Sequence, residues 1–344
     1  MPAIVETVAF TKTLKKVQHM NPMTQSFMAR CALISLGLAA AGAAQAQSSV
    51  NISGMLDIGV YRDTNKDWKV GPIQRSNIAF SGAEDLGGGL SAIFKLSHRF
   101  NPDNGTQEST SKPFWHGEST VGLKGAFGTV QFGRRLDAIY NNDWAFDPWY
   151  NFDRVASPAW DLWHYNFPSD PTGNSGTAEY GRLNSGIFYD SPSFNGVALH
   201  LSGSPATQAA GSTNKPLAAS ITYDSELING MLAHGKNSAG NTDTFIGLKG
   251  NLGALSVMGV YDVSEAGTSK AKATTLGASY AIDKLTLRGS WGQVDVDGSK
   301  AEKVLGVGTL YSLSKRTSTY VDFARKTFPT QSANTYGLGL THNF

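Results

Sequence analysis

The sequence predicts an all-β protein: a 16-stranded antiparallel transmembrane β-barrel with an inward-folded third loop. Three observations predict this fold. Apolar and polar residues alternate in many short stretches, which is typical of strands with two different faces. Short turns alternate with longer connections along the chain. One long aromatic-rich segment, residues 136–178, lacks the two-residue alternation that flanks it on both sides.

The first 46 residues are predicted to be a signal peptide, and residues 47–344 to form the barrel domain. A basic start is followed by a small apolar run, Cys31–Ala43, and by a small-x-small cleavage site at Ala44–Ala46. The apolar run is too short to cross a bilayer as a helix. Met20 and Met23 are alternative true starts.

Loss of this leader changes the charge of the chain. The whole sequence has 29 basic and 27 acidic residues. The leader contains four of the basic residues and one acid, which leaves the mature chain close to neutral. A basic surface for nucleic acid is therefore not predicted. The single cysteine, Cys31, also lies in the leader, so neither disulfides nor thiol chemistry are expected.

The stretch Ser49–Tyr61 predicts the first strand. Its aliphatic residues fall on one face and its polar residues on the other; the aliphatic set is Val50, Ile52, Leu56, Ile58 and Val60. In a soluble sandwich the apolar face points to a core, whereas in an outer-membrane barrel it points to lipid and the polar face lines water. One strand does not decide between the two.

The order of the connections favours the barrel. The short connections are Glu84–Gly89, Gly125–Gly128, Ser191–Gly196, Ser225–Gly230, Gly250–Gly253, Ala281–Asp283 and Ser312–Lys315. The long ones are Asp63–Gln74, Asn101–Phe114, Leu136–Ala178, Pro205–Pro216, Gly235–Asp243, Ser264–Lys270, Asp295–Ala301 and Thr327–Gln331. Fifteen connections in strict alternation require sixteen strands, with short turns at one rim and long loops at the other.

The last strand completes the ring. Its outward face is predicted to carry Tyr336, Leu338, Leu340, His342 and Phe344. An open sheet edge in lipid leaves unpaired backbone groups, so we expect this strand to pair with the first.

Residues 136–178 are predicted to fold into the barrel and narrow it. Four prolines exclude one long helix, and the many aromatics argue against disorder. A connection of this length without regular structure is usually functional. The alternative is a lid packed on top of the molecule.

Strand parity assigns basic side chains to the water-filled lumen. On the sixth strand, for example, Leu183, Ile187 and Tyr189 are predicted to face lipid, which turns Arg182 toward water. The predicted basic residues of the constriction are Arg75, Lys95, Arg99, Arg134, Arg135, Arg182 and Arg288. Parity favours Arg135 over Arg134, and both are kept because strand ends often bulge.

These cations are expected to face carboxylates of the long segment across the pore. The predicted acidic residues are Asp137, Asp143, Asp147, Asp153 and Asp161. Opposite charges on facing walls set an ion preference. The simpler interpretation is that each of these residues is polar only because it touches water.

The tryptophans of the segment admit two interpretations. Trp144, Trp149, Trp160 and Trp163 either anchor the segment to the barrel wall or offer flat faces for a sugar ring or an aromatic acid.

Several stretches resemble the Gram-negative porins of the β-proteobacterial type. They are SSVNISGMLDIGV, SGAEDLGGGLSAIFKL, STVGLKGAFGTVQFGRR, RLNSGIFYDSPSFNGVAL and the terminal HNF. The resemblance implies a sixteen-stranded homotrimer through which small hydrophilic solutes diffuse across the outer membrane. It also implies that the third loop sets the constriction and that Phe344 is the signal read by the barrel-assembly machinery.

The resemblance is incomplete at the constriction. Arg134 and Arg182 match two of the family's arginine positions, but the second-strand position falls on Asn77 and the fourth-strand position falls near His116-Gly117. The sign of the ion selectivity is therefore not predicted.

Enzymatic readings have little support. The histidines are scattered without metal-ligand spacing, no G-x-S-x-G motif is present, and Gly87–Gly89 opens a strand rather than a helix. We expect no enzyme activity, no metal and no cofactor. The predicted function is a passive diffusion channel of the outer membrane, with membrane lipid and lipopolysaccharide as surroundings. A channel preferring sugars or aromatic acids is the alternative, and a barrel enzyme or adhesin is the third hypothesis.

Overall fold

Period-two alternation produces strands over most of the mature chain. A computed structural model describes residues 49–110, 112–167, 181–206 and 212–344. The predicted signal peptide and both alternative start methionines lie outside the described residues, and those assignments stay predictions. Among the described residues, no helix is long and apolar enough to cross a bilayer.

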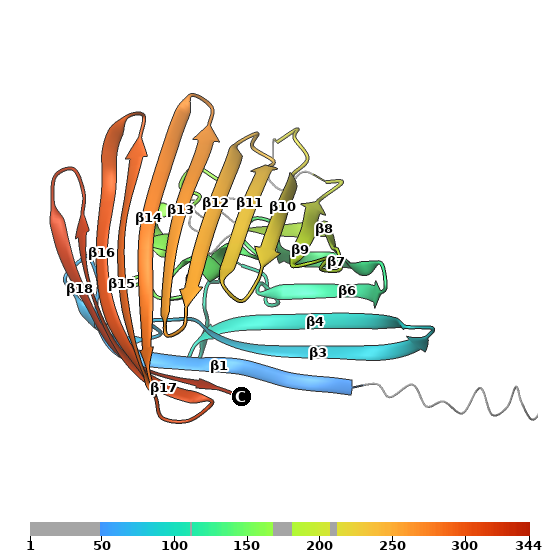
Figure 1. Cartoon of the computed structure of the whole chain (residues 1–344), viewed down its shortest axis with the longest axis horizontal. Helices are drawn as coiled ribbons and strands as arrows, with labels where there is room; N and C mark the ends of the chain where they lie inside the picture. Colours follow the sequence, from blue (N-terminus) through green and yellow to red (C-terminus); the bar gives the residue numbers. More distant parts are fainter. Residues whose placement is uncertain (1–48, 111, 168–180, 207–211) are drawn as a thin grey trace, which may run out of the picture. The chain divides into compact units, whose positions relative to one another are not determined.

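Sixteen long strands form one antiparallel sheet (Figure 1). They are β1 (Ser49–Arg62), β3 (Ser76–Gly87), β4 (Leu90–Asn101), β6 (Glu118–Gly125), β7 (Gly128–Leu136), β8 (Arg182–Asp190), β9 (Val197–Gly203), β10 (Leu217–Asp224), β11 (Ile228–Lys236), β12 (Thr242–Leu252), β13 (Leu255–Ala266), β14 (Ser269–Ile282), β15 (Leu285–Val296), β16 (Ser299–Ser312), β17 (Thr317–Thr327) and β18 (Ser332–Asn343). Two short strands, β2 (Trp68–Gly71) and β5 (Thr106–Gln107), lie in the first two long connections.

The sheet closes on itself. β1 pairs with β3 along one edge and with β18 along the other, with Ile58 opposite Leu340 and Val60 opposite Leu338. The terminal Phe344 exchanges two backbone hydrogen bonds with Gly54. The predicted sixteen-stranded closed barrel is therefore confirmed.

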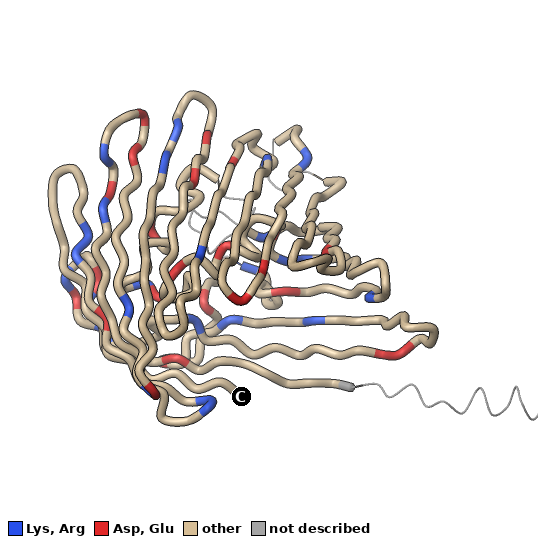
Figure 2. Tube along the Cα trace, viewed as in Figure 1, with Lys and Arg blue, Asp and Glu red and all other residues tan. Residues whose placement is uncertain are grey.

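The barrel is apolar outside and polar inside. On β1, Val50 and Ile52 are 68% and 55% exposed, whereas Asp57 is fully buried. On β18, Leu338 and Leu340 are exposed while Thr335 and Thr341 are buried. Charged residues interrupt the strands only at intervals (Figure 2). This is the polarity of a membrane barrel, and it excludes the soluble sandwich.

Two predicted long loops are wrong, because the flanking strands continue into tight hairpins. β13 and β14 stay paired to Ala266 and Ser269, and β15 and β16 to Val296 and Ser299. Gly267 has positive φ in the first turn, and Asp297 and Gly298 both do in the second. These are the backbone requirements of two-residue hairpin turns, for which Asp-Gly is a strong signal. The connection between β17 and β18 lies where it was predicted, but residues 328–331 are no more than the connection between β16 and β17 contains, residues 313–316. Longer and shorter connections therefore alternate only as far as β13.

One lipid-facing assignment is also wrong. Leu183 is buried rather than exposed. The pairing of β7 with β8 shifts register between Gly133 and Arg135, and Ser185 has positive φ. These irregularities break the two-residue period at this end of β8, so parity counted from Ile187 fails there.

Asp57 joins three parts of the barrel. Its Oδ1 accepts hydrogen bonds from the backbone N–H of Ile73 (2.9 Å) and Gln74 (2.7 Å), and its Oδ2 accepts one from the Tyr320 hydroxyl (2.6 Å). β1, the first long connection and β17 are thus linked through one buried carboxylate.

We expect Asp57→Ala to lower the free energy of unfolding by roughly 3 kcal/mol or more, because it leaves three buried donors without an acceptor. Urea unfolding in detergent micelles, followed by tryptophan fluorescence, measures this. Ser53→Ala on the same strand is the control and should change stability by less than about 0.5 kcal/mol. Equal stability of the two variants would contradict the structural role of Asp57.

Candidate functional site: a constriction inside the barrel

The segment between β7 and β8 folds inward. We call its described part, Leu136–Phe167, the inner segment. It contains a short 3₁₀ helix η1 (Asp143–Phe146) and a short helix α3 (Pro158–Leu162). On β17, Val321 is exposed to the outside, so its neighbour Asp322 faces the lumen. Trp149 of the inner segment donates its indole N–H to Asp322 (2.7 Å), which places the segment inside the barrel.

Further contacts fix the inner segment to the lumen wall. The Trp163 indole donates to Thr275 Oγ1 on β14 (3.3 Å), and Thr335 of β18 donates its hydroxyl to the Val155 carbonyl (2.9 Å). Asp161 forms an ion pair with Lys326 of β17 (2.5 Å). The predicted inward fold is therefore confirmed, and the alternative of a lid on top of the molecule is excluded.

Aspartates determine the local shape of the inner segment. Asp137 accepts from the N–H groups of residues 139 and 140, Asp147 from those of 149 and 151, and Asp153 from those of 155 and 156. Such side-chain bonds to amides a few residues ahead stabilise turns. The bonds explain why a proline-rich segment has a defined structure.

The prediction that five carboxylates face the basic residues across the pore is wrong for Asp137, Asp147 and Asp153, whereas Asp143, although buried, lines the same hollow as three of the predicted arginines. Asp137, Asp143, Asp147 and Asp153 are 2% exposed or less and are hydrogen-bonded within the protein. The carboxylate oxygens that we expected to face water instead accept hydrogen bonds that form turns or hold the segment to the wall. Asp161 does pair with a wall cation, but that cation is Lys326, which sequence reasoning missed.

Three of the predicted basic residues meet the inner segment at one place. Arg75, Arg99 and Arg182, which we call the basic wall, line a small hollow, which we call the basic hollow. Tyr140, Trp144 and Tyr150 of the inner segment line the same hollow. Three of the seven predicted cations are thus brought together.

The four other predicted cations lie elsewhere in the barrel. Lys95 pairs with Glu118 (2.8 Å), and Arg135 pairs with Asp190 (2.7 Å). Arg134 donates to the His116 carbonyl (3.0 Å) and to Asn184 Oδ1 (2.7 Å). Arg288 lines a separate, larger cavity.

The second long connection supports the basic wall. Arg182 Nε donates to the Gly117 carbonyl (2.8 Å), beside the His116 carbonyl that Arg134 uses. His116 Nε2 lies 2.9 Å from Glu108. Burial alone would raise the pKa of Glu108, but the bond to His116 and the charge of Arg99 lower it to about 2. Glu108 is therefore ionised and counters the positive charge behind the wall.

The tryptophans divide between the two interpretations. Trp149 and Trp163 are buried and anchor the segment. Trp160 is partly buried and lies beneath the guanidinium groups of Arg75 (5.0 Å) and Arg154 (5.5 Å). Trp144 is 46% exposed and pairs with the equally exposed Tyr150, their ring centroids 6.0 Å apart. Only Trp144 of the four has a free face in the lumen.

The exposed aromatic pair lies where two spaces meet. Besides the basic hollow, Trp144 and Tyr150 line a cavity of about 690 Å³. Its other walls include Arg288 and Thr286 of β15 and Ser318 of β17. The two aromatic residues are therefore adjacent both to the arginines of the basic hollow and to the larger cavity.

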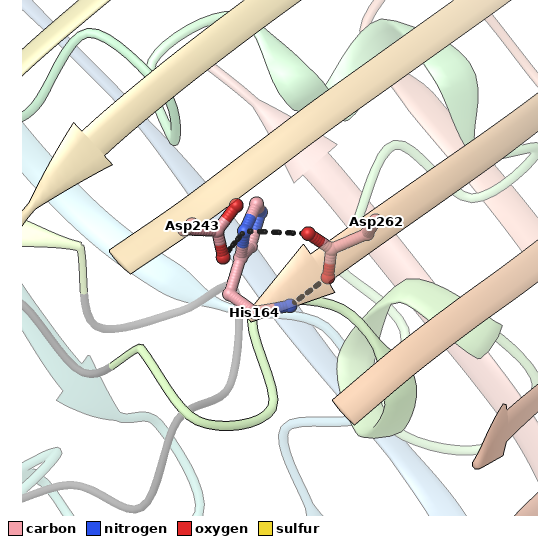
Figure 3. A group of neighbouring side chains, drawn as sticks. All are labelled: His164, Asp243 and Asp262. Atoms are coloured by element: carbon pink, nitrogen blue, oxygen red, sulfur yellow. Dashed lines mark hydrogen bonds and ion pairs between the residues drawn. The ribbon is translucent and has the colours of Figure 1, made fainter. Parts of the chain in front are cut away.

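A buried histidine joins the inner segment to two strands (Figure 3). His164 Nε2 lies 3.0 Å from Asp143 Oδ2, and its Nδ1 lies 2.9 Å from Asp243 Oδ2 on β12. The His164 backbone N–H donates to Asp262 Oδ2 on β13 (2.5 Å). Burial alone would lower the pKa of His164, but Asp243, Asp262 and Asp143 raise it well above its ordinary value.

Sequence reasoning missed this cluster, although strand parity contains a signal for it. Ile246 is exposed on β12 and Tyr261 on β13, so Asp243 and Asp262 fall on the inward faces. Parity was applied only to basic residues of a few strands.

A pH dependence follows from Asp147. Burial raises the pKa of this carboxyl from 3.8 to about 6, against the opposing effect of its hydrogen bonds to Asn151, Ser157 and Trp149. Its contribution to stability is fully present below about pH 4 and is lost as the pH rises through about 6, a loss of roughly 3 kcal/mol.

We therefore expect Asp147→Asn to flatten the decline of unfolding free energy between pH 4 and pH 7. Urea unfolding of the wild type and of Asp147→Asn at pH 4 and pH 7 measures this decline. Subtracting the decline of the variant from that of the wild type isolates the contribution of this carboxyl from that of the others. An equal pH-dependent change in the variant would show that Asp147 does not titrate in this range.

Comparisons with known proteins agree with the geometry. A family model described as Gram-negative porin matches residues 32–331. Outer membrane porin protein 32 of Delftia acidovorans is 27% identical over 327 residues, covering 88% of this chain and 90% of the relative. An outer membrane porin protein of Bordetella pertussis is 24% identical over 383 residues, covering 88% of this chain and 96% of the relative.

Solved structures share the fold. The anion-selective porin from Comamonas acidovorans superposes with a TM-score of 0.73 at 22% identity, covering 87% of this chain and all of that one. OmpT of Vibrio cholerae in its trimer form gives a TM-score of 0.65 at 12% identity, covering 86% and 99%. At these identities the likeness establishes the barrel architecture.

Proposed function

The chain belongs to the Gram-negative porin family, and from this premise we propose an anion-preferring diffusion channel whose constriction is the basic hollow. The protein is an outer-membrane porin with a multi-pass β-barrel, like its relatives from Delftia and Bordetella. The proposal concerns what its constriction admits.

One observation carries the proposed preference. Among the described residues that line the basic hollow, three are arginines and the single carboxylate is Asp143. Asp143 is buried and bonded to His164, so arginines outnumber carboxylates in the described lining of the hollow. A narrow opening whose lining has an excess of one sign of charge favours ions of the opposite sign. The structural neighbour from Comamonas is named for the same preference.

Planar-bilayer recording tests the proposal. With the purified protein in a salt gradient, we expect stable conductance steps and a reversal potential displaced toward that of chloride. A potential displaced toward potassium would refute the anion preference while leaving the channel intact. Folded protein that produces no current would refute the channel itself.

A second candidate, preference for aromatic acids, is favoured by the exposed pair Trp144 and Tyr150. Both residues line the basic hollow together with Arg99, so a ring and a carboxylate could be held together. Saturable block of the current by benzoate, absent with acetate and lost in Trp144→Ala, would support it. Equal effects of both acids would exclude it.

We also propose the assembly and the absence of enzymatic activity. Homotrimers are supported by the resemblance noted above and by the trimer form of the Vibrio neighbour. Phe344 is proposed as the signal for the barrel-assembly machinery, and lipopolysaccharide as an outer contact. Lack of catalysis is supported by a family that consists of channels.

A further inference from the structure

The cluster around His164 has the composition of a metal site. Asp143 and His164 come from the inner segment, Asp243 from β12 and Asp262 from β13. All four side chains are 1% exposed or less. Figure 3 shows the imidazole between the carboxylates of Asp243 and Asp262. One imidazole and two carboxylates converging in a dry pocket are a donor set typical of transition metals.

The charge of the cluster is unbalanced. Three carboxylates face a single imidazole, and among the described residues no lysine or arginine forms an ion pair with Asp143, Asp243 or Asp262. If all three carboxylates are ionised, even a protonated His164 leaves two negative charges in excess. Buried charge without compensation is costly, so the cluster must take up either protons or a cation.

The two ring nitrogens have different surroundings. Asp143 is the one acidic neighbour of Nε2 and accepts its proton in a 3.0 Å bond. With Nε2 holding its proton in this bond, a metal ion would displace the proton of Nδ1, which faces Asp243 Oδ2 at 2.9 Å and Asp262 Oδ1 at 3.8 Å. A carboxylate that orients a histidine through the nitrogen not used for ligation is a recurring arrangement at metal sites.

Unpartnered oxygen atoms point to the same conclusion. Asp262 uses Oδ2 to accept from the His164 backbone, whereas its Oδ1 is buried and has no hydrogen-bond partner. Asp243 Oδ1 is likewise buried and without a partner. Buried carboxylate oxygens are normally satisfied, and these two call either for a bound ion or for a proton shared between Asp243 and Asp262.

We propose that His164 Nδ1, Asp243 Oδ2 and Asp262 Oδ1 bind a divalent transition-metal ion, with Zn²⁺ as the best fit, and that Asp143 orients the imidazole. These three ligand atoms all lie within 4.8 Å of one another. Metal–ligand distances of about 2.0–2.2 Å in a tetrahedral site place ligand atoms about 3.3–3.5 Å apart. His164 Nδ1 lies 2.9 Å from Asp243 Oδ2, which is closer than this spacing, and 3.8 Å from Asp262 Oδ1, which is farther. Movements of under about 1 Å therefore complete the site.

The ligands select the class of ion. Calcium takes six to eight oxygen ligands and magnesium keeps several waters, and neither suits a dry pocket with a nitrogen donor. With a neutral imidazole, a divalent ion reduces the net charge of the cluster from −3 to −1. The remaining charge lies on Asp143, which accepts the Nε2 proton.

Such an ion would tie the constriction to the wall. One ligand comes from the inner segment and two from neighbouring strands. The rings of Tyr140 (4.3 Å), Phe245 (5.5 Å) and Trp163 (6.5 Å) surround the imidazole and exclude water. Because the pocket is closed, the ion enters while the barrel folds, and a chelator removes it only after unfolding.

The experiment uses the full mature chain without a histidine tag. The protein is unfolded in guanidinium with EDTA, refolded into detergent with Zn²⁺ at near-stoichiometric concentration, and desalted. Zinc per chain is measured by elemental mass spectrometry, and circular dichroism verifies the strand content. We expect one Zn²⁺ per wild-type chain and none in Asp262→Asn or Asp243→Asn.

Two further variants sharpen the test. Asp322→Asn alters another buried carboxylate that contacts the inner segment, and it should retain the zinc. Asp143→Asn should bind zinc about 10–100-fold more weakly, because the orienting bond is impaired. Refolded wild-type protein that holds no zinc, or an Asp262→Asn variant that holds as much as wild type, would overturn the proposal. His164 would then act as a protonated clamp between the carboxylates.

Discussion

Reversing Lys95 and Arg99 together is expected to turn the proposed anion preference of the channel into a cation preference. Residues paired across antiparallel strands lie on the same face of the sheet, and Arg99 of β4 pairs with Asn77 of β3, which pairs with Met55 of β1. Met55 lies on the same face of β1 as the buried Asp57, so Arg99 faces the lumen. Lys95, four residues before Arg99 on the same strand, faces the lumen too. The double change to glutamate makes the net charge of the lumen wall more negative by four units. At contact distances in water each charge contributes about 1 kcal/mol, so the permeability ratio should move by at least an order of magnitude.

The measurement is the reversal potential in a KCl gradient, at about 0.1 M and about 1 M salt. The shift should be larger at the lower concentration, where the Debye length is about 10 Å rather than about 3 Å. A matched control is the pair Lys315→Glu and Arg316→Glu. It changes the charge equally, in the exposed turn between β16 and β17. If both double variants shift the potential alike, the net charge of the protein rather than the charge of the lumen wall sets the selectivity.

Replacing Asp143–Tyr165 by a short Gly-Ser linker is expected to raise the single-channel conductance severalfold. The deleted stretch contains Trp144, Tyr150 and Phe152, which line both the basic hollow and the large cavity. Its removal joins the two spaces into a wider opening. The wall residues that held the segment, such as Asp322, remain on the strands.

Conductance steps and the block by neutral polymers of graded size measure the widening. Replacing Asn65–Lys66 by two glycines, in the exposed turn between β1 and β2, is the control and should leave both unchanged. Unchanged conductance in a folded deletion variant would mean that the inner segment does not limit the current.

Strand number, outward faces and ring closure followed from the sequence. The period-two pattern is local, so Val50 and Leu338 were assigned to the lipid face without knowledge of their partners. The same rule failed where local irregularity breaks the period, as at Leu183 beside the shifted pairing of Gly133 and Arg135. It also placed loops where Asp297-Gly298 forms a two-residue turn, although Asp-Gly is itself a readable signal.

The constriction was only partly predictable. Arg75, Arg99 and Arg182 were expected at the pore and line one hollow. Asp147 and Asp153 were expected there too, but they accept hydrogen bonds from amides two to four residues ahead. An aspartate in a turn and an aspartate facing a pore have the same composition, and only the backbone conformation separates them.

By itself the sequence determined the barrel and its inside-out polarity, because both depend on which side of a strand each residue occupies. The tertiary structure alone decided how the inner segment is held. Trp149 meets Asp322 across 173 positions and His164 meets Asp262 across 98. Such contacts depend on the curvature and register of a closed sheet, which no local pattern of residues contains.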